Sequence, residues 1–245
     1  MSDAMTPAYG GRARMALVVP SPNTVAETEF WQMAPAGVTV HTSRMPFFPE
    51  KFSNPLGAME EQATRVLEEA ATAEPDIIAY GCTASSAVGN PDVYERDLVA
   101  TTGRATVTAA AALVAAIRSF GVHRIALVTP YPPQVNQKEA KFFKENGIEV
   151  VVDESLIVDP AQQIMKNMRL VPPSMIIESA CTMGARDDVD AIVLACCDMP
   201  TLEAIEPIEQ RTGKPVASST QALFWRALRT AGIEDSVPGC GRLLA

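Results

Sequence analysis

Two short stretches of the chain share one form, and both end in a cysteine. DIIAYGC begins at Asp76 and ends at Cys82, and DAIVLAC begins at Asp190 and ends at Cys196. In each, a thiol follows an aspartate by six positions and ends an apolar run typical of a buried strand. A thiol that precedes a helix N-terminus has a lowered pKa and is a good nucleophile. The two cysteines could form one active site, although core packing is the common role of a free cysteine.

Strand-like and helix-like segments alternate along the rest of the chain, which predicts an α/β fold with parallel sheets. Most strand-like runs are apolar on both faces, as buried parallel strands are. We expect strands at 15–20, 38–45, 76–82, 124–130, 148–154, 190–196 and 215–219. We expect helices at 56–73, 106–120, 134–146, 160–168, 174–185, 201–212 and 219–231.

The sequence also shows an internal duplication. ALVVPSPN begins at Ala16 and ALVTPYPP begins at Ala126, an offset of 110, and the two cysteine phrases are offset by 114. Matching offsets in the same order predict two pseudo-symmetric Rossmann-like (flavodoxin-like) halves, with the active site in the cleft between them. The expected divisions are a flexible N-terminus at 1–14, a first half at 15–105 with the tail 226–245 packing back onto it, and a second half at 106–225.

Polar turns follow several of the predicted strands, where open α/β sheets bind their ligands. Their hydroxyl and amide groups could bind a carboxylate, or could instead cap helices and close turns. Cys197 should face away from Cys196, since neighbours on an extended chain point in opposite directions, and packing is its expected role. The candidates for substrate contact are Ser21, Asn23, Thr83, Ser85, Tyr131 and Cys197. No histidine falls in these turns, so a Ser-His-Asp or Cys-His pair is not supported.

Composition excludes several classes of partner. The chain has 245 residues and a net charge of −9 without a basic stripe, which argues against nucleic acid. No apolar run approaches the roughly 18 residues of a membrane span, and no signal peptide is visible. With five cysteines, two histidines and no CxxC, neither a disulfide framework nor a metal site is expected. No phosphate-binding loop is present. We therefore expect a cytoplasmic protein that uses no cofactor and no metal. A homodimer or homotetramer is the expected assembly, although nothing in the composition fixes it.

The motifs resemble those of the aspartate/glutamate racemase superfamily, and most closely the maleate cis-trans isomerases and arylmalonate decarboxylases. The resemblance runs nearly end to end, and it aligns the catalytic cysteine with Cys196 rather than Cys197. Two segments depart from the isomerase pattern: TASSAVG after Cys82 is more polar, and IVDPAQQ (157–163) lacks an asparagine. The motifs that carry the resemblance are LVVPSPNTVAETE (17–29), HTSRM (41–45), RIALVTPY (124–131), ACCDMPTLEAI (195–205), TGKPVASS and VPGCGRLL.

The resemblance implies a cofactor-independent isomerase that converts a small cis-dicarboxylate into its trans isomer. Cys82 would add to the double bond and Cys196 would deliver the proton. One alternative is an aspartate/glutamate-type or hydantoin racemase, in which the same two thiols act as opposed acid and base. An arylmalonate-type decarboxylase is a further alternative, although the decarboxylases carry a glycine in place of the first cysteine. A non-catalytic binder of small carboxylates also stays open.

Overall fold

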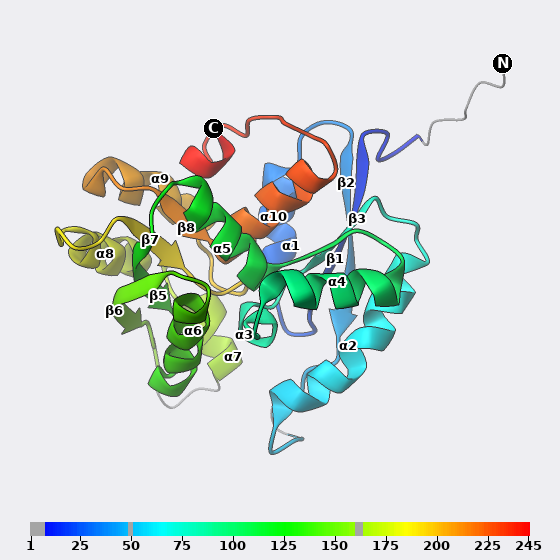
Figure 1. Cartoon of the computed structure of the whole chain (residues 1–245), viewed down its shortest axis with the longest axis horizontal. Coiled ribbons are helices and arrows are strands. Elements are labelled where there is room, and N and C mark those ends of the chain that lie inside the picture. The colour runs from blue at the N-terminus through cyan, green and yellow to red at the C-terminus, as the bar shows by residue number, and fades with distance from the viewer. Residues whose placement is uncertain (1–7, 49–50, 160–163) are drawn as a thin grey trace.

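The computed structural model describes residues 8–48, 51–159 and 164–245, and within them the strands form two four-stranded sheets (Figure 1). The sheet orders are β2-β1-β3-β4 and β6-β5-β7-β8, and all pairings are parallel. The two sheets thus have the same topology, which confirms the predicted α/β fold with two similar halves. The strands are β1 (Ala13–Pro20), β2 (Val38–Met45), β3 (Ile77–Tyr80), β4 (Thr106–Thr108), β5 (Arg124–Thr129), β6 (Glu149–Ser155), β7 (Ala191–Leu194) and β8 (Val216–Ser218).

The helices follow the strands in a similar order in the two halves. They are α1 (Ala26–Met33), α2 (Pro55–Ala71), α3 (Thr83–Ser86), α4 (Pro91–Thr102), α5 (Ala109–Ser119), α6 (Pro133–Glu145), α7 (Ile164–Leu170), α8 (Pro173–Gly184), α9 (Leu202–Thr212), α10 (Ser219–Thr230) and the 3-10 turn η1 (Arg242–Leu244). The expected helix at 106–120 was wrong in its first turn, because residues 106–108 pair with β3 as β4. The expected helix at 160–168 falls partly on 160–163, which lie outside the described residues.

Both faces of the central strands are buried, as their apolar runs predicted. Along β1, Ala16 and Val18 face a core that α2 and α4 cover, while Leu17 and Val19 face the opposite core. This second core contains residues of both sheets and of α1, α5, α6 and α10, so it joins the two halves. A third core lies on the far face of the second sheet, under α8 and α9.

The aspartate that begins each cysteine phrase has a structural role. Asp76 accepts a hydrogen bond from the backbone N–H of Arg14 at 2.7 Å, and Asp190 accepts two from the Arg124 guanidinium at 2.9 and 2.6 Å. Each pair joins the start of a cysteine-bearing strand to the start of the neighbouring strand in its sheet. The Arg124 side chain holds the pKa of Asp190 below its usual value. The aspartates therefore fix strand register at the edge away from the cysteines.

Helices α5 and α10 hold the two halves together, and they lie between the sheets in Figure 1. Each begins at a hydroxyl cap: Thr108 accepts from the N–H of Ala111, and Ser218 accepts from the N–H of Gln221. The rings of Phe30 on α1 and Phe224 on α10 meet edge to face, with centroids 5.1 Å apart. Such an aromatic pair contributes about 1 kcal/mol beyond its buried area.

The structure modifies the expected divisions of the chain at three places. The N-terminal segment 1–14 falls partly on residues 1–7, outside the described part, and its last two residues already belong to β1. The second half was expected to begin at 106, yet β4 completes the first sheet. The tail contacts both halves, because Asp235 pairs with Arg12 at 2.6 Å while Arg242 donates its N–H to Glu209 at 3.0 Å.

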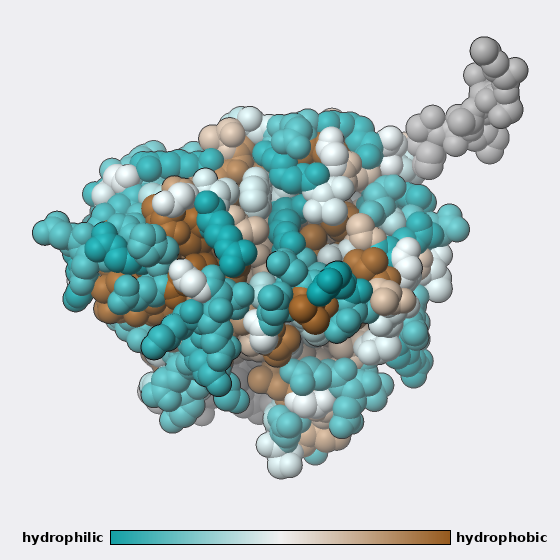
Figure 2. Space-filling model, viewed as in Figure 1, coloured by the Kyte–Doolittle hydropathy of each residue, from teal (hydrophilic) through white to brown (hydrophobic). Residues whose placement is uncertain are grey.

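Polar residues cover most of the molecular face shown in Figure 2. This agrees with the net charge of −9 and with the burial of most large apolar side chains. Across the described residues, no helix combines the length and apolar character that crossing a bilayer requires.

Candidate active site

Cys82 and Cys196 line the same cavity, which lies between the two halves. Each cysteine comes two residues after the end of its strand, β3 or β7. The cavity has a volume of about 60 Å³, room for about two water molecules. Its lining residues are Pro20, Asn23, Phe47, Leu56, Gly81, Cys82, Thr83, Ala84, Tyr131, Met168, Cys196, Cys197 and Asp198. The duplicated phrases thus bring one thiol from each half to one site.

Cys196 lies in the more buried environment of the two. It is 3% exposed, and its sulfur accepts the backbone N–H of Asp198 at 3.3 Å. Burial raises the pKa of the Cys196 thiol well above its usual value, and the nearby Asp198 carboxylate raises it further, while the Tyr131 hydroxyl lowers it. Cys196 is therefore held in its protonated form.

Cys82 is partly exposed and precedes the first turn of α3. Burial raises the pKa of its thiol, whereas the hydroxyl and backbone N–H of Ser85 lower it. The carboxylates of Glu139 and Glu60 raise this pKa again. Cys196 also has two groups that favour its thiolate, the Tyr131 hydroxyl and the Asp198 N–H, so the two cysteines differ in their exposure rather than in the number of such groups.

Asp198 is a buried carboxyl beside the thiols. One oxygen accepts the backbone N–H of Thr24 at 2.9 Å, and the other has no hydrogen-bond donor among the described residues. Burial raises the pKa of Asp198 to about 6, and the guanidinium of Arg169, 4.0 Å away, lowers it. Sequence reasoning did not single out Asp198, although it directly follows the Cys196–Cys197 pair.

Asn23, Thr83 and Tyr131 line the cavity as the sequence predicted. Asn23 also shows its alternative role as a turn residue: its side-chain oxygen accepts the N–H groups of Val25 and Ala26, and its amide donates to the carbonyl of Cys197 at 3.0 Å. The Thr83 hydroxyl donates to Ser219 at 2.8 Å, which leaves it an acceptor rather than a donor toward the cavity.

Ser21 and Ser85, the two serines predicted to contact substrate, are not among the residues that line the cavity. The Ser21 hydroxyl accepts the backbone N–H of Phe47 at 3.1 Å and so positions that residue, which does line the cavity. The Ser85 hydroxyl lies 3.0 Å from the hydroxyl of Tyr80 and donates to the backbone carbonyl of Cys82 at 3.5 Å. The hydroxyls of both serines form hydrogen bonds within the protein and so stabilise the turns around the site.

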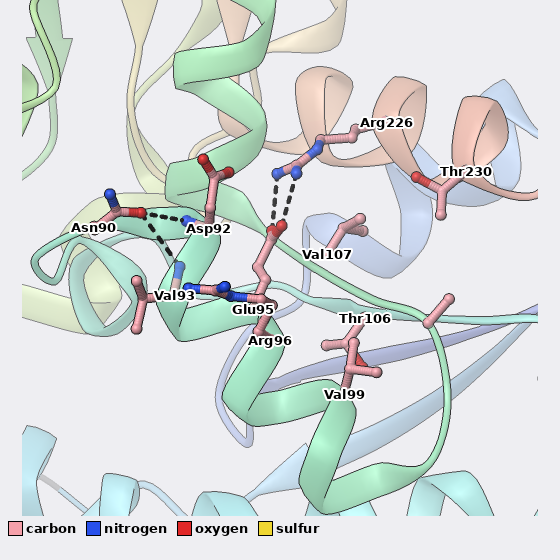
Figure 3. Close-up of a pocket in the computed structure, with 11 residues that line it drawn as sticks. Asn90, Asp92, Val93, Glu95, Arg96, Val99, Thr106, Val107, Arg226 and Thr230 are labelled. Atoms are coloured by element: carbon pink, nitrogen blue, oxygen red, sulfur yellow. Dashed lines mark hydrogen bonds and ion pairs between the residues drawn. The ribbon is translucent and has the colours of Figure 1, made fainter.

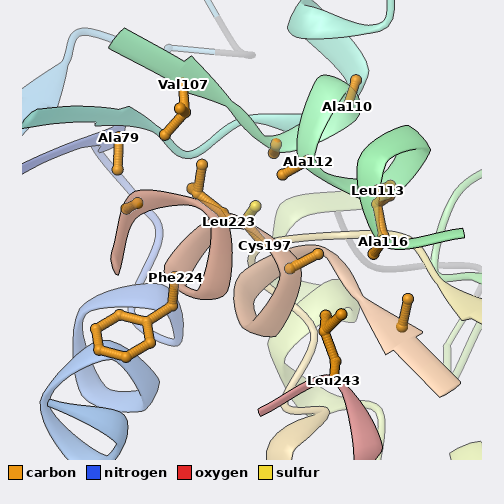
Figure 4. Packing of buried hydrophobic residues seen from close by; sticks show 14 of the residues in the cluster. Ala79, Val107, Ala110, Ala112, Leu113, Ala116, Cys197, Leu223, Phe224 and Leu243 are labelled. Carbon is orange, nitrogen blue, oxygen red and sulfur yellow. The ribbon is translucent and has the colours of Figure 1, made fainter. Parts of the chain in front are cut away.

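Cys197 packs in the core shared by both halves, beside Leu223 and α5 (Figure 4). Cys196 belongs to the separate core of the second sheet, so the adjacent side chains face different ways. The Cys197 sulfur lies 3.6 Å from the Thr83 hydroxyl, and Cys197 also contributes to the cavity wall. Its burial raises the pKa of its thiol. Cys197 therefore packs in the shared core and also lines the cavity.

An apolar wall completes the cavity and was not predicted. Phe47 follows β2, Leu56 lies on α2, and Met168 lies on α7. These side chains come from three separate segments, and an apolar residue at such a position is indistinguishable in sequence from a core residue. Apolar side chains lower the local dielectric constant, which strengthens electrostatic interactions inside the cavity.

A larger open hollow of about 670 Å³ lies between α4, β4 and α10 (Figure 3). Two of its charged groups pair with each other, since Arg226 donates to both carboxylate oxygens of Glu95 at 2.8 and 2.6 Å. Asn90 caps α4 by accepting from the N–H groups of Asp92 and Val93. No cysteine is among its lining residues in the described chain. Residues 8–48, 51–159 and 164–245 also contain no group of three His, Cys, Asp or Glu side chains placed to hold a metal ion.

Comparison with known proteins identifies the family. The arylmalonate decarboxylase family model matches residues 54–244. A maleate isomerase of Nocardia farcinica is 31% identical over 96% of this chain and 96% of its own length. The crystal structure of a cysteine-to-alanine variant of the maleate isomerase Iso of Pseudomonas putida S16 with maleate is 30% identical, covering 94% of this chain and 96% of that chain, with a TM-score of 0.83.

A second solved structure carries chemical information about a relative. It is a cysteine-to-serine variant of the Nocardia farcinica maleate cis-trans isomerase with a covalently bound succinylcysteine intermediate. It covers 94% of this chain and 97% of that chain at 30% identity, with a TM-score of 0.83. The chain therefore belongs to the arylmalonate decarboxylase family and, within it, is similar along nearly its whole length to the maleate isomerases.

Proposed function

We propose that this protein catalyses the cofactor-independent cis-trans isomerisation of a small dicarboxylate of the maleate type. The observation that carries the proposal is the presence of Cys82 and Cys196, from equivalent turns of two duplicated halves, in the wall of one cavity. Isomerisation requires a nucleophile at one alkene carbon and a proton donor at the other, and two thiols can supply both. The resemblance to maleate isomerases over 96% of the chain supports the same assignment.

The reaction follows from the chemistry of a thiol and an activated alkene. The Cys82 sulfur adds to one alkene carbon, and the π electron pair moves to the other carbon, which takes the proton of the Cys196 thiol. The bond between the two carbons is then single and can rotate. The Cys196 thiolate removes the proton again, the C–S bond breaks, and the trans isomer leaves. The succinylcysteine intermediate in the Nocardia relative is an adduct of this class, which supports the proposal.

The environments of the two thiols support this division of roles. Asp198, whose N–H contacts the Cys196 sulfur, raises the pKa of Cys196 through its charge and so favours a protonated donor. Cys82 is the more exposed of the two cysteine residues, which suits it to attack a substrate. The thiolate is the attacking species in covalent catalysis by cysteine. Cys82 is therefore the nucleophile and Cys196 the proton donor in our proposal.

Turnover of maleate and intact-protein mass together test the proposal. Replacing Cys82 with alanine should lower turnover by more than about a thousandfold and abolish the covalent adduct, because the nucleophile is lost. Replacing Cys196 with alanine should lower turnover similarly, yet allow an adduct to accumulate. Cys197→Ala is the matched control, and it should stay within about tenfold of the wild type because its sulfur packs in the core.

Three results would contradict the proposal. Full activity in both the Cys82→Ala and Cys196→Ala variants would exclude a thiol mechanism. A loss in Cys197→Ala as large as that in Cys196→Ala would mean that the wrong adjacent cysteine was chosen. A wild-type protein that leaves maleate unchanged, but racemises aspartate or a hydantoin or decarboxylates an arylmalonate, would move the assignment to another reaction of this family.

A further inference from the structure

The wall of the cavity offers no cation to a dicarboxylate substrate. Among the residues of the described chain that line it, none is a lysine, an arginine or a histidine, and Asp198 adds a carboxyl group. Two of its polar side chains donate within the protein, since Thr83 donates to Ser219 and the Asn23 amide donates to the carbonyl of Cys197. A substrate with two carboxylates therefore meets a third carboxyl group in this wall.

Asp198 lies on the Cys196 side of the cavity and has one oxygen without a hydrogen bond. Its backbone N–H is 3.3 Å from the Cys196 sulfur, which places the residue beside that thiol. Asp198 is 3% exposed, and its Oδ1 atom accepts the N–H of Thr24 at 2.9 Å. Its Oδ2 atom has no hydrogen-bond donor among the described residues. Because a buried polar atom without a partner is unfavourable, a ligand that forms a hydrogen bond with Oδ2 gains affinity.

Two arginines lie near Asp198, and each also has an acceptor of its own. The guanidinium of Arg169 on α7 is 4.0 Å from Oδ2 and donates to the carbonyl of Pro22 at 3.0 Å. Arg44 on β2 donates to the carboxylate of Glu27 at 2.8 Å. Burial raises the pKa of Asp198 to about 6, although the N–H groups that it accepts and the two arginines lower it. The nearby cations therefore do not hold Asp198 in its ionised form across the neutral range.

A second carboxylate beside Asp198 favours the sharing of one proton between the two groups. Two carboxylates at hydrogen-bond distance do not both stay ionised, because like charges repel strongly where the local dielectric constant is low. Cys196 and Cys197 are the other titratable groups that couple to Asp198, and burial raises the pKa of both thiols and keeps them protonated. The Asp198 carboxyl is thus the group in this part of the wall that can take up a proton as the substrate binds.

We propose that Asp198 binds the substrate carboxylate nearest Cys196 through a shared proton, an inference that rests on the isomerase function proposed above. The proton enters from solvent as the cis-dicarboxylate binds and returns to solvent as the trans product leaves, so turnover consumes none. The carbon that Cys196 protonates bears this carboxylate, which takes up the charge of the π pair before protonation. A hydrogen bond from protonated Asp198 therefore stabilises both the bound substrate and the transient charge. The pair keeps one negative charge beside Cys196.

Proton uptake during the binding of succinate is the first measurement. Succinate is a dicarboxylate without a double bond, so it binds without reacting. Calorimetry at pH 7.5 in two buffers with different heats of ionisation gives the number of protons taken up per succinate. The wild type should take up about one proton. Asp198→Asn should take up almost none, because the amide keeps the bond to Thr24 through its oxygen and offers an N–H in place of the shared proton.

Glu29→Gln is the matched control for this measurement. Glu29 is also a buried carboxyl, and burial raises its pKa to about 7, so it titrates in the same range as Asp198. It is not among the described residues that line the cavity. Its replacement should leave the proton uptake unchanged, because this carboxyl does not meet the ligand.

The pH dependence of kcat/KM for maleate is the second measurement. In the wild type, ionisation of Asp198 should lower kcat/KM by about tenfold per pH unit as pH rises above about 6. Asp198→Asn should lack this fall, because the amide does not ionise. The ratio of kcat/KM in the variant to that in the wild type should therefore rise about tenfold between pH 7 and pH 8. The ionisation of maleate is common to both proteins and cancels in this ratio.

Each result decides the inference. A wild type that binds succinate without proton uptake, or does not bind it, would overturn the inference, and neither result depends on how a variant folds. Equal uptake in the wild type and Asp198→Asn, a constant ratio of kcat/KM, or loss of uptake in Glu29→Gln would overturn it as well.

Two outcomes separate this inference from its alternatives. If the wild type takes up a proton with succinate but does not isomerise maleate, the proposed function fails and the shared proton stands. If the wild type takes up no proton and Arg169→Gln loses succinate binding at every pH, the guanidinium binds the carboxylate and the shared proton is refuted.

Discussion

Replacing Glu29 with glutamine should stabilise the protein at pH 8 far more than at pH 5. The Glu29 side chain is buried, with one oxygen bonded to two backbone N–H groups and the other without a donor in the described structure. Burial raises the pKa of Glu29 from 4.5 to about 7, although the N–H groups of Leu202 and Thr201 lower it. A glutamine can keep both bonds through its carbonyl oxygen, and it never ionises.

The pKa shift fixes the sign and size of this effect. Because the folded-state pKa is raised, the protonated carboxyl favours the folded state fully below about pH 4.5, and this contribution is lost as pH rises through about 7. A shift of about 2.5 units corresponds to about 3 kcal/mol in total, at 1.36 kcal/mol per unit. Part of it is already lost at pH 5. The Glu29 contribution should therefore fall by about 2–3 kcal/mol between pH 5 and pH 8, and the variant should not show this fall.

Urea unfolding of both proteins at pH 5, 6, 7 and 8 measures the difference. The free energy of unfolding of Glu29→Gln minus that of the wild type should rise with pH by about 2–3 kcal/mol. Asp198, with a pKa raised to about 6, gives a dependence of the same sign in both proteins, so it cancels in this difference. A difference that stays constant with pH, or falls, would show that Glu29 is ionised in the folded protein throughout this range.

Two further changes test the cavity and the junction of the halves. Tyr131→Phe should lower kcat about tenfold or more, because its hydroxyl eases ionisation of the Cys196 sulfur; steady-state kinetics that show an unchanged kcat would contradict this. Arg226→Met should lower the free energy of unfolding by about 3 kcal/mol, the lower end of the range for breaking a buried ion pair. The Arg226 side chain is 23% exposed, and the change leaves Glu95 without its cation. A urea midpoint equal to that of the wild type would show that Glu95 finds another partner.

The sequence predicted the regular part of the fold because that part follows simple patterns. Strand-like runs between turns identified seven of the eight described strands, and the central ones are apolar and buried on both faces, whereas the edge strands β2 and β6 are partly exposed. β4 was missed because its three residues, Thr106–Thr108, run directly into the apolar helix α5 and read as its first turn. Helices α1 and α4 were missed as well, since their stretches carry many polar residues and little apolar periodicity.

The candidate site was predictable where the duplication marked it. The paired phrases singled out Cys82 and Cys196, and both line one cavity. Ser21 and Ser85 were chosen only because polar residues follow strands, and such hydroxyls can equally bond within their own turns. Phe47 and Met168 could not be found this way, because an apolar side chain at a cavity wall obeys the same pattern as one in a core.

The duplication also explains why equivalent positions do not have equivalent roles. Thr83 and Cys197 are related by the offset of 114 and meet at the junction of the halves, where the sulfur lies 3.6 Å from the hydroxyl. The segments that follow differ in length, since α3 is a single turn while α9 spans Leu202–Thr212. Glu29 accepts two N–H groups at the start of α9, whereas Glu139, at the equivalent position by the offset of 110, has no donor among the described residues. A repeat read from sequence therefore predicts which residues occupy equivalent positions, while the surroundings of each residue decide which hydrogen bonds it makes.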